Sequence, residues 1–299
     1  MLAKSPKIKT PLSRKATLLL VSTSCWTARK LDREVTDETN ERYHASEVAG
    51  RFNKLIIGAE HTKVLTEIIN EARALFYKFT LPWADEGPRV LPNANYKKFA
   101  DEFRPLVRKF EAAADKFERN YPGYVEEAKR YLNGMWKAKD YPAPDTIRSK
   151  FKLEMSLLQF PDANDFRADL DEDVLEDIRD ELKASSTGEA AMKATVDRII
   201  EVVGHMAEKL KTYKTKDECQ EGEKRSFFAD TLVGNVRELA DLLPSFNLTD
   251  DPKLTAITKR IQQELCAEEP DVLREEKDVR ASVQASAEEI VKEVSKFFA

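Results

Sequence analysis

Apolar side chains recur at steps of three and four residues along two long stretches of the chain. The first run is Tyr96, Phe99, Phe103, Leu106, Phe110, Ala113 and Phe117. The second is Met192, Val196, Ile199, Val203, Met206, Leu210 and Tyr213. A heptad repeat of this kind predicts a helix that packs along a seam, either in the core of its own chain or against another chain.

The two seams supply the candidate interface residues for the second of these alternatives: Phe99, Phe103, Phe110, Phe117, Val196, Ile199, Val203 and Met206. Pro105 lies inside the first run, so we expect either a kink there or a junction of two helices. Tyr121-Pro122-Gly123 is expected to end that helix.

The same periodicity predicts further helices over 60–79, over a shorter stretch from Val125 to Trp136, and near Val174–Leu182. Phe228 to Leu243 predicts another, stopped by Pro244, and 275–298 predicts the last. Asp251-Pro252 has the form of an N-cap followed by a first-turn proline, and it is expected to begin one more helix.

Candidate β-strands are fewer. Residues 17–26 are rich in β-prone side chains, Leu55-Ile56-Ile57 is a short apolar run, and 151–158 alternate between apolar and polar positions. The expected fold class is therefore mainly α. We expect an elongated multi-helix bundle with long coiled-coil-like helices, and a small β-sheet from the N-terminal and central segments.

Length and composition fit this fold. The chain has 299 residues but only nine glycines, which favours helices joined by short connections. We expect a basic flexible tail over 1–16, a helical region with the candidate strands over 17–160, and a C-terminal helical region over 161–299. The last two regions could also form one continuous domain.

Charge and cysteine usage limit the partners and the compartment. The net charge is −5, so the basic excess typical of nucleic-acid-coating proteins is confined to the N-terminal tail. The three cysteines, Cys25, Cys219 and Cys266, are widely spaced and form no CxxC motif, which favours a reducing cytoplasm. The apolar run 16–22 is too short for a membrane span.

The sequence contains no recognisable catalytic, metal or nucleotide motif. His44, His61 and His205 stand at no metal-binding helical spacing, and GxxxxGK[ST], GxGxxG and GxSxG are absent. We therefore expect no cofactor, no metal and no catalytic residue. The best candidate for a binding site is the proline-braced loop 80–93, with Trp83, Asp85, Glu86 and Arg89. The alternative is a rigid connection between helices with Trp83 in the core.

Four long strings carry a resemblance to a known family: SCWTARKLDREVTDE, TLPWADEGPRVLPNANY, YPGYVEEAKRYLNGMWKAKDYP and FADTLVGNVRELADLLPSFNLTDDPKL. They resemble an uncharacterised family of bacteriophage and prophage proteins, catalogued only as a domain of unknown function. The resemblance implies a phage or prophage origin and a cytoplasmic location in the infected or lysogenic host. It supplies no activity. Because members of that family are sometimes encoded near MoxR-like AAA+ ATPases, it also suggests such an ATPase as a partner.

Three functions follow as expectations. The favoured one is a non-enzymatic structural or interaction protein that self-associates or docks another protein through its heptad faces. The second is an adaptor or substrate of a MoxR-like AAA+ ATPase. The third is an enzyme with a site around the 80–93 loop.

Overall fold

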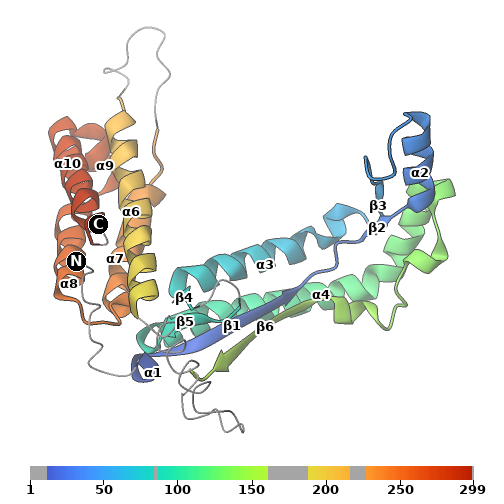
Figure 1. The fold of residues 1–299 in the computed structure, drawn as a ribbon, viewed down its shortest axis with the longest axis horizontal. Helices are drawn as coiled ribbons and strands as arrows, with labels where there is room; N and C mark the ends of the chain where they lie inside the picture. Colours follow the sequence, from blue (N-terminus) through green and yellow to red (C-terminus); the bar gives the residue numbers. More distant parts are fainter. Residues whose placement is uncertain (1–11, 84–86, 161–187, 216–226, 298–299) are drawn as a thin grey trace, which may run out of the picture. The chain divides into compact units, whose positions relative to one another are not determined.

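The computed structural model describes residues 12–83, 87–160, 188–215 and 227–297, and within these ranges the chain is mainly helical with a small antiparallel sheet (Figure 1). Its contacts form two compact units. Unit 1 contains the described residues of Met1–Leu20, Phe79–Lys97 and Leu157–Ala299, and unit 2 contains Val21–Lys78 and Lys98–Ser156. Among the described helices, none combines the length and the apolar character that crossing a lipid bilayer requires.

The four-stranded sheet has the order β4-β5-β1-β6. Its strands are β1 (Ala16–Ser24), β4 (Leu81–Pro82), β5 (Arg89–Pro92) and β6 (Lys152–Leu158). β5 pairs antiparallel with both neighbours, with Leu18 opposite Val90 on one side and Leu81 opposite Val90 on the other. The strands expected at 17–26 and 151–158 are thus confirmed as β1 and β6.

The third expected strand is displaced. The strand is β3 (Asn53–Leu55), which pairs antiparallel with β2 (Arg29–Leu31), whereas Ile56 and Ile57 lie beyond its end and are buried. A run of apolar residues indicates burial, but it does not fix which residues pair. Helix α2 (Arg33–Arg42) lies between β2 and β3 in the chain.

Unit 2 is built on two long helices, α3 (Ala59–Phe79) and α4, which begins at Tyr96 and ends at Leu132. Pro105 and Pro122 both lie inside α4, so the expected helix end at residues 121–123 is wrong. Proline removes one backbone hydrogen bond and disfavours a helix interior. The row of large side chains that α4 buries outweighs this local cost, and Tyr121 itself is only 1 % exposed.

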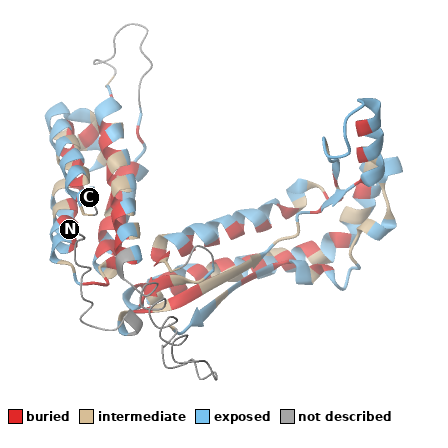
Figure 2. Cartoon of the chain, viewed as in Figure 1, coloured by how far each residue is buried: buried red, intermediate tan, exposed pale blue. Residues whose placement is uncertain are grey.

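The first heptad run lies on the buried side of α4 (Figure 2). Phe99, Phe103 and Phe110 are fully buried and Phe117 is 2 % exposed. Phe117 contacts Trp26 and Phe151 edge to face, with ring centroids 6.4 and 4.9 Å apart. Such aromatic pairs add to the stabilisation that burial itself provides.

Unit 1 contains the C-terminal helices around one apolar core. They are α6 (Gly188–Thr212), α7 (Thr231–Phe246), α8 (Pro252–Arg260), a π-helical turn (Ile261–Leu265), α9 (Pro270–Glu275) and α10 (Lys277–Val294). Helix α6 packs against α7 and α10, and Val196, Ile199, Val203 and Met206 on it are 3 % exposed or less. The helix expected near 174–182 lies outside the described residues.

The eight seam side chains proposed above as interface residues are therefore core residues in the structure. The four phenylalanines lie in unit 2 and the other four residues in unit 1, and all eight are buried by their own chain, which is the intramolecular alternative for both seams. The repeat describes one apolar face of a helix and does not specify what covers that face. The coiled-coil and elongated-bundle features of the expected fold stay predictions.

The tail and the domain boundary also need adjustment. Residues 1–11 of the expected flexible tail lie outside the described residues, but Leu12–Lys15 form α1, and Lys15 forms an ion pair with Asp250 at 2.5 Å. Unit 1 combines residues on both sides of the boundary expected at residue 160, because the β4–β5 hairpin pairs with the first half of β1 and β4 contacts α6.

Two helix ends in unit 1 show which local signals are reliable. Pro244 was expected to stop α7, but the helix continues through it to Phe246. The N-cap expected at Asp251 is confirmed, because its carboxylate accepts hydrogen bonds from the backbone N–H groups of Lys253 and Leu254 at 2.7 and 3.2 Å.

Replacing Asp251 by alanine is expected to lower the free energy of unfolding of unit 1 by about 1 kcal/mol, because the first turn of α8 loses its capping acceptor. Chemical denaturation followed by circular dichroism measures the change. Asp251→Asn is the matched control and should remain close to the unsubstituted protein, since asparagine also caps. Equal losses in both variants would show that the charge, and not the capping bond, matters.

Candidate functional site

The candidate binding loop 80–93 is a β-hairpin rather than a loop, since β4 and β5 pair within it. Trp83 is half-buried and packs edge to face on Phe160, with ring centroids 5.0 Å apart. Arg89 donates from Nε to the hydroxyl of the buried Thr80 at 2.8 Å, and Arg198 of α6 donates to the carbonyl of Thr80 at 3.1 Å. Trp83 and Arg89 thus hold the hairpin in place. Asp85 and Glu86 lie outside the described residues.

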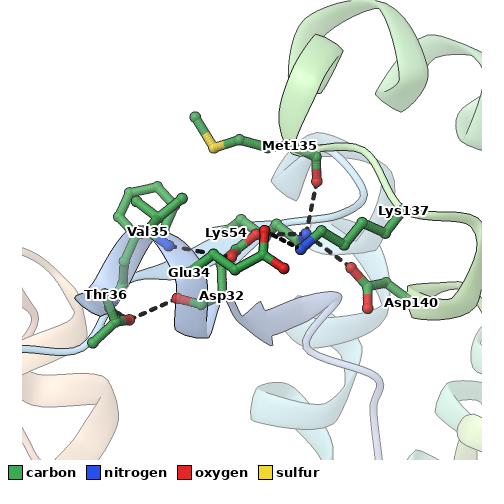
Figure 3. Close-up of polar contacts among 9 residues, drawn as sticks. Asp32, Glu34, Val35, Thr36, Lys54, Met135, Lys137 and Asp140 are labelled. Carbon is green, nitrogen blue, oxygen red and sulfur yellow. Dashed lines mark hydrogen bonds and ion pairs between the residues drawn. The ribbon is translucent and has the colours of Figure 1, made fainter. Parts of the chain in front are cut away.

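A buried charge cluster, made by Asp32, Lys54 and Asp140, lies elsewhere, in unit 2 (Figure 3). Lys54 comes from β3, Asp32 is the residue that caps α2, and Asp140 ends a short 3-10 turn, Ala138–Asp140. The Lys54 ammonium lies 2.8 Å from a carboxylate oxygen of each aspartate and donates to the Met135 carbonyl at 2.7 Å. One lysine therefore joins three segments that are distant in the sequence.

Each member of this cluster is shielded from solvent. The side chains of Lys54, Asp32 and Asp140 are 2, 3 and 7 % exposed. A buried charge is tolerated when it is paired and hydrogen-bonded, and this arrangement meets both conditions for Lys54. Asp32 also accepts a bond from the Val35 N–H at 3.4 Å, which fixes the start of α2.

The electrostatics favour the charged forms of Lys54 and Asp32. The hydrogen bond from Lys54 holds the pKa of Asp32 below its usual value. Burial alone would lower the pKa of Lys54, but the bonds to Asp140 and Asp32 outweigh it and the net shift is upward. A lysine acts as a base or nucleophile only when it loses its proton near neutral pH. Lys54 is therefore a structural cation.

An open cleft of about 590 Å³ lies beside this cluster. Its lining is rich in cationic side chains and consists of Arg29, Lys30, Leu31, Asp32, Arg33, Glu34, Lys54, Lys137, Lys139 and Asp140. Arg29, Lys30, Arg33 and Lys139 are exposed, and Lys137 pairs with Glu34 at 2.8 Å. The lining contains six cationic side chains and three acidic ones, so the cleft as a whole keeps an excess of positive charge. We name this feature the basic cleft.

The fold brings the rim residues to one side through strand pairing. Lys30 stands opposite Lys54 in the β2–β3 register, and directly opposed residues of an antiparallel pair project to the same face. The acidic partners of Lys54 relieve the repulsion between these two lysines. The arrangement is suited to binding a negatively charged group.

Sequence reasoning missed this site because its parts carry no local motif. Lys54 lies 22 residues from Asp32 and 81 from Met135 in the sequence. The one available signal was Asp32 before a helical stretch, which is a typical N-cap residue. That signal predicts a helix start, but it does not predict a partner for the carboxylate.

A second cluster of titratable groups lies in the same unit, formed by Glu60, His61 and Glu127. His61 Nε2 lies 3.0 Å from a Glu127 oxygen and 3.7 Å from a Glu60 oxygen. Within the described part of the chain, these are the residues whose geometry could hold a metal ion.

The described cysteines offer no activated nucleophile. Cys25 and Cys266 are free thiols, and burial raises the pKa of each. A raised thiol pKa lowers the fraction of reactive thiolate. Cys219 lies outside the described residues.

Comparison of the chain with models of protein families, with curated proteins and with solved structures gave no match. The resemblance to the phage family and the suggested ATPase partner therefore stay predictions.

Proposed function

We propose that the chain is a non-enzymatic helical interaction protein whose basic cleft binds an acidic segment of a protein partner. The observation that carries this proposal is the paired Lys54, which fixes β3, the start of α2 and the 138–140 turn beneath an excess of exposed cations. Exposed cations whose positions are fixed by a buried ion-pair cluster can recognise a partner of complementary charge.

The chemistry of the cleft supports binding rather than catalysis. Its one buried cation is held protonated between two carboxylates, and the pKa of the Asp32 carboxyl is lowered, so neither group is suited to take up a proton near neutral pH.

The partner class follows from the mixture of side chains. Glu34 stands among the rim cations, and the exposed Leu31 adds an apolar contact. A nucleic-acid-coating surface normally lacks such interspersed acids. An acidic protein segment that also carries apolar residues fits both features.

A second copy of this chain is the partner that the sequence supports. The segment 161–187, which lies outside the described residues, is rich in Asp and Glu and includes Phe166, Leu170 and Leu175. Its composition is complementary to the basic cleft. In this proposal two copies of the chain associate through the basic cleft and not through the heptad seams, which are buried.

Size-exclusion chromatography with light scattering tests the proposal. We expect an oligomer in low salt that dissociates as salt screens the charges. The double variant Arg29→Glu, Lys30→Glu should associate at least tenfold more weakly, because like charges then face each other across the contact.

Arg108→Glu, on the exposed side of α4, is the matched charge-reversal control and should associate like the unsubstituted chain. A monomer at all protein concentrations in low salt would overturn the self-association. An oligomer that survives the double reversal would overturn the role of the basic cleft.

A further inference from the structure

The start of α3 and the last third of α4 bring three metal-ligating side chains to one place in unit 2. Glu60 and His61 belong to the first turn of α3, and Glu127 comes from α4, 66 residues away from His61 in the sequence. Their ligand atoms all lie within 4.8 Å of one another.

The imidazole of His61 is held in position by its surroundings. Its ring stacks on that of Tyr124, with centroids 3.8 Å apart and planes inclined by 19°. Tyr124 in turn packs on the buried Phe117 at 5.3 Å. Tyr124 and Glu127 are three residues apart on α4 and so lie on one face of the helix. The stack therefore directs Nε2 toward Glu127.

The carboxylate of Glu60 occupies space that only glycine leaves open. It folds back over Gly58, where an added Cβ would lie 2.2 Å from Glu60 Oε1. A larger residue at position 58 would displace the carboxylate from His61. The glycine thus permits the approach of Glu60 Oε1 to His61 Nε2.

The cluster carries a local excess of negative charge. In the ion pairs of the described residues, Glu60 and Glu127 both pair with His61. The two carboxylates also act at a distance, because they raise the pKa of Tyr131 in addition to the effect of burial. Two carboxylates and one imidazole nitrogen gathered in this way form a site for a divalent cation.

We propose that Glu60 Oε1, His61 Nε2 and Glu127 Oε2 bind a zinc ion. Zinc takes imidazole nitrogen and carboxylate oxygen at about 2.0–2.2 Å, which places tetrahedral ligand atoms about 3.3 Å apart. The distances of 3.0 and 3.7 Å from His61 Nε2 to the two carboxylates lie on either side of that value. Calcium and magnesium prefer oxygen ligands alone, so the imidazole selects against them.

The ion would link the start of α3 to α4. The Glu60 and Glu127 side chains are 67 and 50 % exposed, so a fourth coordination position faces solvent and can hold water. Because these two helices form the length of unit 2, the linkage is expected to stabilise that unit. The proposed zinc site shares no residue with the basic cleft, so the two proposals are independent of each other.

Isothermal titration of the chelator-treated full chain with ZnCl₂ tests the site. We expect one zinc ion per chain, with MgCl₂ and CaCl₂ giving no comparable binding. Cobalt(II) is a second probe, because a four-coordinate site gives visible absorption bands far stronger than those of hydrated cobalt. Zinc should also raise the melting temperature of unit 2.

His61→Gln is expected to weaken zinc binding at least tenfold, and Glu127→Gln should have the same direction of effect. His44→Gln, which removes an exposed histidine from the same unit, is the matched control and should bind like the unsubstituted chain. The metal-free melting temperature and circular dichroism of each variant show whether it is folded. No zinc binding, or binding that is unchanged in folded His61→Gln, would overturn the proposal.

Discussion

Replacing Lys54 with methionine is expected to lower the free energy of unfolding of unit 2 by about 3 kcal/mol. The substitution keeps an apolar stem but leaves two buried carboxylates without their cation, and breaking a buried ion pair from one side costs about 3–5 kcal/mol. We place the effect at the lower end because the basic cleft allows water close to Asp32 and Asp140.

Tryptophan fluorescence can report this loss for unit 2 alone. The chain has three tryptophans, of which Trp26 and Trp136 lie in unit 2 and Trp83 in unit 1. Chemical denaturation in a Trp83→Phe background therefore follows unit 2. Lys137→Met is the matched control, since it removes a half-exposed lysine paired with an exposed Glu34, and should cost less than about 1 kcal/mol.

A triple variant separates lost charge pairing from lost packing. Lys54→Met combined with Asp32→Asn and Asp140→Asn removes all three charges, and asparagine at position 32 still caps α2. We expect it to recover at least half of the stability lost in the single variant. If it is less stable than Lys54→Met alone, unpaired carboxylates are not the cause of the loss.

Replacing Phe110 with alanine is expected to cost unit 2 about 3–5 kcal/mol. The ring is fully buried, so the change removes apolar burial and leaves a cavity between elements of the same unit. The melting temperature should fall by the same amount at every protein concentration, because a core residue is covered by its own chain. A residue at an interface between chains would give a concentration-dependent loss.

Val64→Ala on α3 is the control for this second experiment. Val64 is 54 % exposed, so its truncation should change stability by less than about 0.5 kcal/mol. If the loss in Phe110→Ala disappears at high protein concentration, the first heptad run contacts a second chain after all.

Helical periodicity was the part of the sequence that could be interpreted with most success. It placed the seam residues of α4 and α6 on one buried face, because a spacing of three and four residues follows from helix geometry alone. The alternation along 151–158 predicted β6 for the same kind of reason. Neither pattern contains information on which surface covers the face.

Proline and short hairpins were misinterpreted for a common reason. Pro122 and Pro244 lie inside helices that they were expected to end, and Pro82 and Pro92 lie in the strands of a hairpin that was expected to be a loop. In each case the local signal is real but small, of the order of 3 kcal/mol in a helix interior. Burial of several neighbouring side chains provides more than that.

The polar features could not be predicted from the sequence. Helix α2 buries Thr36 and Asn40 rather than apolar residues, so it shows no hydrophobic periodicity. Likewise the Lys54 cluster and the Glu60–His61–Glu127 cluster each join segments that are distant in the sequence. Charge pairs of this kind become visible only when the fold places the segments together.

The division of the chain between the units has a consequence for biosynthesis. Unit 2 ends at Ser156, whereas unit 1 needs Leu157–Ala299 in addition to its two earlier segments. At about 5–20 residues per second, translation of that remainder takes on the order of 10 s. Unit 2 can thus fold on the ribosome while β4 still awaits α6, which contacts it, and the apolar early segments of unit 1 are the part of the nascent chain that a chaperone would protect.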